Sequence, residues 1–436
     1  MRKPGKSRAG RKPAAAGETT PAEFKQSVHG ASGMSFRTDG GAMSGDVADL
    51  ISFEEGLRDG RSIAPSDLGL KSGLLPRQKI EVMIQRRMVW AVREFEPTQL
   101  QPASLDLRLG SKAYRVRASF LPGKGKSVAA QLAQLKSDEI ALERGAVLER
   151  GCVYVVELME HLHLPDSITA VANPKSSTGR LDVFTRLITD EGEAFDFVTG
   201  GYRGRLYAEI SPRSFSIRVR SGSKLNQIRF RKMNSRHDDH TSFIIKDRDL
   251  KKIHDKTPLV DGLLSLRGGL ILRIELSSVG NDQLIGYKAQ TYTDVVDVDL
   301  VNEYKREHFW EPIKANPESR IILDPHRFYI LVSKEKLHIP PGLAAEMIPI
   351  DPIMGEFRVH YAGFFDPGFG FTEHGFPGSR AVLEVRSHEV PFILEDGQMV
   401  GRLAYERLAE APDSLYGQIG TSNYQGQELK LSKHFA

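Results

Sequence analysis

The sequence predicts a mainly β protein that contains two copies of one barrel or sandwich domain and a few short helices. Between residues 140 and 276, short runs of alternating apolar and polar residues are separated by Gly, Pro, Asn and Asp, as in antiparallel strands joined by turns. A repeated pattern of residues links this part of the chain to the part that follows it. The length of 436 residues also exceeds what one typical core can organise, so two or three domains are expected.

Residues 1–70 differ in composition from the rest of the chain. They are rich in Gly, Ser and Pro, and basic residues cluster within the first 12 positions. This composition predicts a disordered basic tail rather than a segment that binds nucleic acid or a membrane. The start lacks the apolar core of a signal peptide, and no later stretch approaches the roughly 20 apolar residues of a membrane span. Cys152 is the only cysteine, which excludes an intramolecular disulfide and Cys-rich zinc sites and makes a reducing cytoplasm the expected compartment.

The regular elements are expected to begin near Leu75. A helix is predicted from Pro76 to about Trp90, because proline suits the first helical position and apolar residues follow at helical spacing. The next stretch, 101–110, alternates leucines with Asp106 and Arg108 and is typical of a half-buried strand. A second helix is predicted over 127–135. The strands predicted after it are 153–158, 205–210, 215–219, 227–230, 242–245 and 270–276.

The internal repeat has a constant offset of 175 residues. At this offset Tyr154 falls on Tyr329, His163 on His338, Arg205 on Arg380 and Glu209 on Glu384, with no gap. We interpret the repeat as two copies of one β-domain, at residues 71–250 and 251–436, that meet in the polar stretch around 247–262. These are called the first copy and the second copy below.

The stretch Asn173–Arg180 brings two hydroxyls and two cations together at a predicted helix start. Ser176 and Ser177 are good helix-capping types, and a turn opening there would direct backbone N–H groups, Lys175 and Arg180 toward an anion. An ordinary capped turn with solvated charges is the alternative. The equivalent stretch of the second copy, 350–355, has lost both hydroxyls and both cations, so an anion site is expected only in the first copy.

The second copy has a different distinctive stretch, His360–Gly370, in which Asp-Pro-Gly is typical of a turn between aromatic strands. The first copy carries acidic residues at this place, which are poor neighbours for a polyphosphate. The simplest hypothesis is one complete site built from complementary halves, with the cationic loop from the first copy and the hairpin and a strand carboxylate from the second. The alternative is that each copy drifted without any division of function.

Several motifs together resemble the deoxycytidine triphosphate deaminases of the trimeric dUTPase-like superfamily. In chain order they are Gln-Pro-Ala-Ser-Leu-Asp-Leu-Arg-Leu-Gly at 101–110, Lys-Ser-Ser-Thr-Gly-Arg at 175–180, Phe-Asp-Pro-Gly-Phe at 365–369, Ala-Val-Leu-Glu-Val at 381–385 and Ser-Asn-Tyr-Gln-Gly-Gln at 422–427. The motifs are spread from residue 101 to the C-terminus, so the resemblance extends over about four fifths of the chain. The tandem arrangement is similar to a longer bacterial form of the enzyme. The resemblance implies two dUTPase-like β-domains and hydrolytic deamination of dCTP to dUTP and ammonia.

The resemblance also implies a role for each matched residue. Glu384, with Glu209 as the alternative, would take a proton from the water that attacks C4 of cytosine. Arg180 would keep that carboxylate ionised, and Ser176 would position the water or the amine. The implied substrate contacts are Lys175 and Ser177 for the phosphates, Ala362 and Asp366 for the base edge and deoxyribose, and Tyr424 and Gln427 as the cover of the triphosphate. Lys175 stands where the family has Arg, so a point charge replaces a planar fork.

No protein-bound metal is expected, and magnesium would accompany the substrate triphosphate. Zinc-dependent deamination is excluded by the single cysteine. Two other functions stay open. The superfamily's hydrolysis of dUTP would use a hairpin aspartate to activate water, so Asp366 keeps this reaction open, alone or together with deamination. The degraded repeat also suits a non-catalytic deoxynucleotide sensor. A deoxynucleotide triphosphate is the expected partner, without nucleic acid or membrane, and a homo-oligomer is possible with sites within or between chains.

Overall fold

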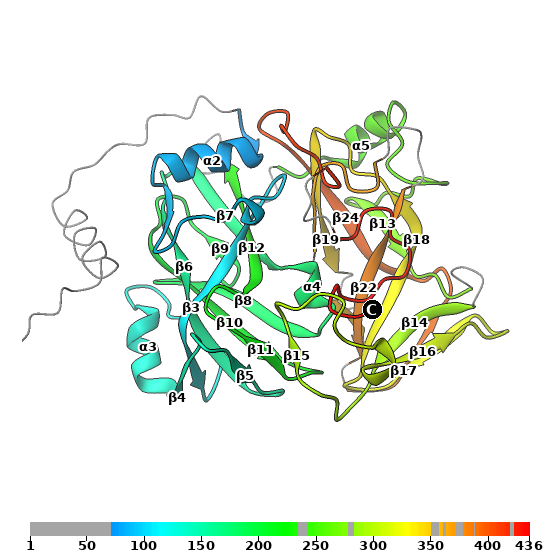
Figure 1. Cartoon of the computed structure of the whole chain (residues 1–436). Helices are drawn as coiled ribbons and strands as arrows, with labels where there is room; N and C mark the ends of the chain where they lie inside the picture. Colours follow the sequence, from blue (N-terminus) through cyan, green and yellow to red (C-terminus); the bar gives the residue numbers. More distant parts are fainter. Residues whose placement is uncertain are drawn as a thin grey trace, which may run out of the picture. The chain divides into compact units, whose positions relative to one another are not determined.

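The computed structural model describes residues 71–233, 243–277, 283–349, 357–360, 363–371, 378–387, 389–418 and 423–436. All of them belong to one compact unit, Asp59–Ala436, which is mainly β as predicted (Figure 1). The tail predicted over residues 1–70 lies outside the described residues. None of the helices in the described part of the chain is long and apolar enough to cross a membrane.

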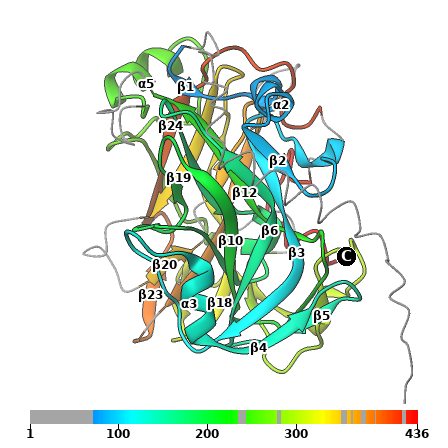
Figure 2. The same ribbon diagram turned by 90° about the vertical axis from the view of Figure 1, so that its left-hand side faces the viewer.

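The first copy folds as a curved antiparallel sheet that almost closes on itself. Along its main path the strands run in the order β8-β10-β6-β3-β12-β7-β9, and β8 also contacts β9 at the opposite end of that path. The strands of this sheet are β1 (Gly73–Leu74), β2 (Val89–Ala91), β3 (Leu105–Val116), β4 (Lys136–Ala141), β6 (Val153–His163), β7 (Ile168–Pro174), β8 (Val183–Thr189), β9 (Phe197–Val198), β10 (Arg203–Pro212) and β12 (Lys224–Lys232). Figure 2 views the molecule from the side of this sheet.

The second copy divides its strands among smaller sheets. One has the order β13 (Leu270–Arg273), β24 (Met399–Arg407), β19 (Leu343–Pro349) and β21 (Phe364–Phe365). Another has the order β16 (Trp310–Lys314), β14 (Leu284–Ala289), β18 (Phe328–Leu337), β22 (Ser379–Ser387) and β20 (Phe357–His360), and β17 (Arg320–Leu323) pairs with β23 (Phe392–Glu395). The internal repeat is visible in these bounds. β19 and β24 begin and end 175 residues after β7 and β12 respectively.

The helices are short and lie outside the sheets (Figure 1). They are α2 (Arg77–Gln85), α3 (Val128–Leu135), α4 (Ser176–Gly179) and α5 (Asp247–His254), with 3-10 turns at Pro97–Gln99 and Arg306–His308. The prediction for α3 is confirmed, and the Ser127 hydroxyl accepts a hydrogen bond from the Ala130 backbone N–H. The prediction for α2 was too long, because Arg87 adopts a φ of 55° and the chain turns into β2. Of the strand predicted at 242–245, residue 242 lies outside the described residues. The rest forms only an isolated β-bridge, between Ile244 and Glu406.

The first part of β3, residues 105–109, is buried on both faces, although alternation predicted that one face would be solvated. Asp106 is 3% exposed and Arg108 is 2% exposed. Arg108 forms an ion pair of 2.8 Å with the buried Glu160, and Asp106 forms one with Lys175. Asp106 and Arg108 can be buried because each lies beside a residue of opposite charge.

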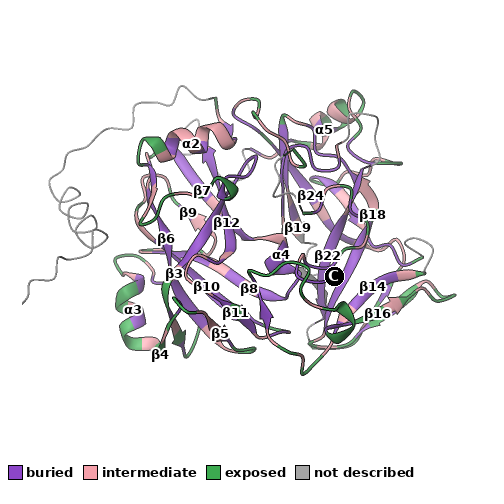
Figure 3. Cartoon of the chain, viewed as in Figure 1, coloured by how far each residue is buried: buried purple, intermediate pink, exposed green. Residues whose placement is uncertain are grey.

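The two copies share packing as well as sequence pattern. β15 (Val296–Asp297), from the second copy, pairs in parallel with β11 (Ile217–Val219) of the first copy, which also pairs with β5 (Ala146–Leu148). Next to this junction, Phe215 of the first copy meets Trp310 and Phe435 of the second at ring-centre distances of 5.3 and 6.4 Å. Figure 3 shows the strands on both sides of the junction as largely buried. The C-terminal residues are therefore anchored in a core that both copies build.

Candidate active site

A pocket lies where the two copies meet. The first copy contributes Gln101, Lys175, Ser176, Ser177, Arg180 and Gln227 to its lining. The second contributes Phe364, Phe365, Asp366 and Glu384, and its C-terminal segment adds Tyr416, Asn423, Tyr424 and Gln427. The residues predicted for the cationic loop, the hairpin, the glutamate strand and the C-terminal arm are thus brought together, with two exceptions. Ala362 lies outside the described residues, and Glu209 is elsewhere.

The cationic loop is the short helix α4, which follows directly on β7. Lys175 occupies the N-cap position and Ser176 and Ser177 lie inside the turn, so the prediction that a serine hydroxyl caps this turn is wrong. The Lys175 ammonium is ion-paired with the Asp106 carboxylate of β3. The Ser177 carbonyl accepts a hydrogen bond of 2.7 Å from the Ser432 hydroxyl. Residues far apart in the sequence therefore fix the loop from both sides.

Glu384 faces this loop from β22 and is only 7% exposed to solvent. The two copies approach so closely here that a Cβ atom on Gly179 would lie 2.8 and 2.9 Å from the two carboxylate oxygens of Glu384. A side chain at position 179 would therefore displace the Glu384 carboxylate. Burial raises the pKa of Glu384 well above its usual range, Arg180 opposes the shift, and the negative charge of Asp182 adds to it.

Arg180 is held in the pocket by the C-terminal segment. One guanidinium nitrogen donates to the Lys430 carbonyl at 2.9 Å, and the other donates to the Gln427 side-chain oxygen at 2.9 Å. The guanidinium carbon lies 3.8 Å from the centre of the Tyr424 ring, which is cation–π geometry. Tyr424 and Gln427 therefore contact Arg180, in addition to lining the pocket as predicted.

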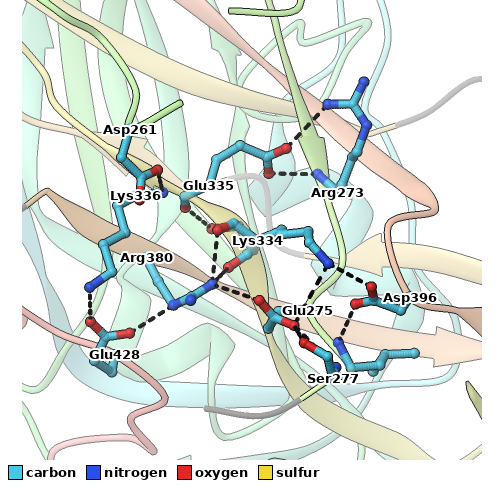
Figure 4. Close-up of polar contacts among 12 residues, drawn as sticks. Asp261, Arg273, Glu275, Ser277, Lys334, Glu335, Lys336, Arg380, Asp396 and Glu428 are labelled. Atoms are coloured by element: carbon cyan, nitrogen blue, oxygen red, sulfur yellow. Dashed lines mark hydrogen bonds and ion pairs between the residues drawn. The ribbon is translucent and has the colours of Figure 1, made fainter. Parts of the chain in front are cut away.

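Gln427 is itself fixed against strand β22 by Arg380. The Gln427 amide donates to the Arg380 carbonyl at 2.9 Å, and the Arg380 backbone N–H returns a bond of 3.1 Å to the Gln427 carbonyl. The Arg380 side chain pairs with Glu428 at 2.7 Å, and Lys336 pairs with the same carboxylate at 2.6 Å (Figure 4). This surface network keeps the segment that holds Arg180 against the strand that carries Glu384.

The predicted hairpin forms the opposite wall of the pocket. Asp366 follows β21 and accepts a hydrogen bond of 2.8 Å from Arg229, which comes from β12 of the first copy. Burial raises the pKa of Asp366, and the charge of Arg229 lowers it. The aspartate therefore lies in the pocket as a buried, ion-paired acid.

Glu209, the alternative glutamate, has its own environment inside the first copy. Its carboxylate is ion-paired with Arg186 at 2.6 Å, and the Arg186 guanidinium carbon lies 3.4 Å from the centre of the Phe195 ring. Glu209 does not line the junction pocket. The structure therefore does not bring it together with Ser176 and Arg180.

Sequence reasoning missed several residues of this pocket. Gln101 and Asn423 lie inside motifs that were recognised, and only their roles were overlooked. Tyr416 carries no local signal, since it reaches the pocket through the fold of the C-terminal segment. Gly179 had a signal, because a glycine between two functional residues permits close approach. Among the described residues, no group of three or more His, Cys, Asp or Glu is arranged to hold a metal ion.

A solved structure of a known protein has a similar fold. A crystal structure of 2'-deoxycytidine 5'-triphosphate deaminase from Agrobacterium tumefaciens superposes with a TM-score of 0.73 and 52% sequence identity. The match covers 77% of this chain and 99% of that one. The predicted dUTPase-like β fold is thereby confirmed.

The family follows from sequence models of its two domains. The N-terminal domain model of 2'-deoxycytidine 5'-triphosphate deaminase matches residues 71–234, and the C-terminal domain model matches residues 246–435. The chain belongs to this family, in its tandem-domain form, as the motifs predicted.

Curated relatives named "dCTP deaminase, dUMP-forming" also match. The protein from Sulfurihydrogenibium is 28% identical over 148 residues, covering 33% of this chain and 76% of its own length. The protein from Persephonella marina is 26% identical over 163 residues, covering 37% of this chain and 84% of its own length.

Proposed function

We propose that this protein deaminates dCTP hydrolytically to dUTP and ammonia in the junction pocket. The observation that carries the proposal is the meeting of Glu384 with α4, since it places a buried carboxylate beside a cation and a serine. Membership of the deaminase family supports the same substrate and reaction.

In the proposed mechanism, Glu384 is the general base. It takes a proton from water as the water oxygen bonds to C4 of cytosine, and it passes a proton to the amino group, which leaves as ammonia when the C4–N bond breaks. Burial raises the pKa of Glu384 and so makes its ionised form a stronger base than an exposed carboxylate. Arg180 opposes this shift and so favours the ionised form that the mechanism needs.

Arg180 and Ser176 serve the same step. Arg180 is fixed by Gln427 and Lys430, so its charge stays beside Glu384 without needing a reorganisation during the reaction. Ser176 lines the pocket one turn before Arg180 and is assigned to orient the water or the leaving amine.

The nucleotide is proposed to span the pocket from the hairpin to α4. Phe364 and Asp366 would contact the base and deoxyribose, and Lys175 and Ser177 would bind phosphate oxygens. Lys175 is paired with Asp106, but an ammonium group has three donors, so donors remain for the phosphates. Magnesium would accompany the triphosphate and be bound through its oxygens. Ala362 keeps its predicted role at the base edge.

The test is incubation of the purified full-length protein with dCTP, with ammonia and pyrophosphate measured separately. Release of ammonia with dUTP as the product is the expected result. Nucleotide binding without any product would instead indicate a sensor and would contradict the proposal.

A second candidate is continued hydrolysis of dUTP to dUMP in the same pocket. It is favoured by the position of Asp366 in the lining and by the relatives whose names include dUMP formation. Asp366 would then activate water at the α-phosphate. Pyrophosphate released in step with ammonia would support this candidate, and dUTP that accumulates unchanged would exclude it.

The remaining assignments are also proposals. A deoxynucleotide triphosphate is the partner, with neither nucleic acid nor a membrane expected. Light scattering would measure whether the chain forms a homo-oligomer. The reducing cytoplasm remains the expected compartment, on the ground that Cys152 is the single cysteine of the sequence.

A further inference from the structure

Strand β12 of the first copy sends a buried arginine into the second copy behind the pocket wall. Arg229 is 1% exposed and donates from one guanidinium nitrogen to Asp366 at 2.8 Å. Its other terminal nitrogen donates to the Ala345 carbonyl of β19 at 3.1 Å. The guanidinium carbon lies 4.1 Å from the centre of the Phe364 ring. One side chain thus contacts two of the hairpin residues that line the pocket, Phe364 and Asp366, and also the strand β19 that pairs with the hairpin.

A second arginine on the same face of β12 provides a built-in comparison. Arg231 is also buried, and it crosses the same junction to pair with Glu406 at 2.9 Å and with Glu346 at 3.3 Å. Neither of these glutamates lines the pocket. The two arginines therefore tie the copies together in similar ways, but only Arg229 contacts residues that line the pocket, namely Phe364 and Asp366.

We propose that Arg229 is a positioning residue for nucleotide binding, which sets the orientation of Asp366 and Phe364 from the other copy. The proposal rests on the proposed function, because the hairpin is taken as the base and deoxyribose side of the site. Arg229 itself lies behind the wall and is not among the pocket-lining residues.

The shape of the guanidinium group explains why arginine is needed. It is planar and forked, so it can donate to Asp366 and Ala345 in two fixed directions while its face covers Phe364. Lysine would keep the positive charge and lose this fixed geometry. Replacement by lysine should therefore leave the copies joined but allow the hairpin to shift, and small misplacements of substrate-positioning groups have large effects.

The experiment compares Arg229→Lys with Arg231→Lys in the full-length protein. For Arg229→Lys the Kd and KM for dCTP are expected to rise about tenfold with kcat within about twofold, because an interaction shared by ground and transition states is weakened. For Arg231→Lys both constants should stay within about twofold of the unchanged protein. Thermal unfolding of both variants supplies the structural readout, and both should lose stability, since each weakens a buried ion pair.

A double-mutant cycle with Asp366→Asn tests the route of the effect. If Arg229 acts through Asp366, Asp366→Asn alone should raise the Kd for dCTP, and Arg229→Lys should add little in that background. This arm also keeps the test decisive if Arg229→Lys proves insoluble, since a Kd for Asp366→Asn equal to that of the unchanged protein would overturn the inference.

Two other outcomes would overturn it. Equal Kd values for Arg229→Lys and Arg231→Lys would show that Arg229 only joins the copies, and full additivity in the cycle would show that it does not act through Asp366. The proposed function fails in a different way. No ammonia from the unchanged protein would refute deamination, while the Kd measurements would still decide the role of Arg229 in dCTP binding.

Discussion

Glu209 and Glu384 occupy the same place in the two copies and have opposite surroundings. They lie on equivalent strands, β10 and β22, and both are almost fully buried. Glu209 is neutralised inside its own copy by Arg186 at 2.6 Å. Glu384 faces α4 of the other copy, where Gly179 leaves room for its carboxylate and Arg180 is held beside it by the C-terminal segment. Equivalent positions in the fold therefore give the two glutamates different surroundings, and the catalytic role proposed for Glu384 rests on its neighbours.

The first copy achieves this neutralisation with residues that the second copy lacks. Arg186 stands where the second copy has Tyr361, and its guanidinium lies against Phe195. This ion pair neutralises the buried Glu209 carboxylate, which lies outside the junction pocket. One glutamate is therefore paired inside the first copy, and the other lies at the junction of the two copies.

The largest expected effect is that of Glu384→Gln. Because the amide cannot accept the proton from water, kcat for dCTP should fall by roughly 10³-fold, while the Kd for dCTP changes little. Rapid-quench measurement of ammonia and calorimetric titration of dCTP give the two quantities. A variant that retains more than a tenth of the activity would remove Glu384 from its assigned role.

Gly179→Ala should come next in size. The added Cβ would lie within 3 Å of both Glu384 carboxylate oxygens, so the base must move, and kcat/KM should fall by about 100-fold. Gly342→Ala is the matched control, because a Cβ at Gly342 meets no atom within 4 Å. Equal kcat/KM values for the two variants would show that the contact at Gly179 has no bearing on turnover.

Asp182→Asn should shift the pH profile rather than abolish activity. The negative charge of Asp182 helps to raise the pKa of Glu384, so its removal should lower that pKa. The base must be ionised to act, and activity is lost as pH falls through its pKa. The acidic limb of the kcat/KM profile should therefore move to lower pH, and a move to higher pH would contradict the assigned base.

Glu209→Gln should have the smallest effect on turnover. With Glu209 outside the pocket, kcat and KM should stay within about twofold of the unchanged protein. The loss should be in stability, at about 1 kcal/mol, because the amide still accepts a hydrogen bond from the partly exposed Arg186 but carries no charge. Urea unfolding measures this loss. Abolished turnover in a folded variant would instead place the active site in the first copy.

Much of the fold could be predicted because it depends on local patterns. Alternating runs predicted the strands, and the constant offset between Glu209 and Glu384 predicted two copies, since a repeat preserves spacing even where residues change. The predictions failed where tertiary contacts override local pattern. Asp106 and Arg108 at the start of β3 are buried because Lys175 and Glu160 neutralise them.

The sequence predicted which segments form the candidate site, but it did not predict the side-chain contacts between those segments. Motif order predicted that α4, the hairpin, Glu384 and the C-terminal arm belong together, and the structure places them around one pocket. The contacts of Arg180 with Gln427 and of Arg229 with Asp366 had no sequence signal, because each joins residues more than 100 positions apart. Such pairs depend on how the two copies pack, which no local pattern encodes.

The most direct test of the central claim, that one chain supplies both halves of the site, is a complementation experiment. Arg180→Gln retains an intact Glu384, and Glu384→Gln retains an intact α4. The two variants would be co-expressed with different tags, purified through both tags if they associate or mixed if they do not, and assayed for ammonia release from dCTP. A site built within one chain predicts no more activity than the sum of the two variants alone. Clear recovery of turnover would mean that the halves come from different chains, and would contradict the claim.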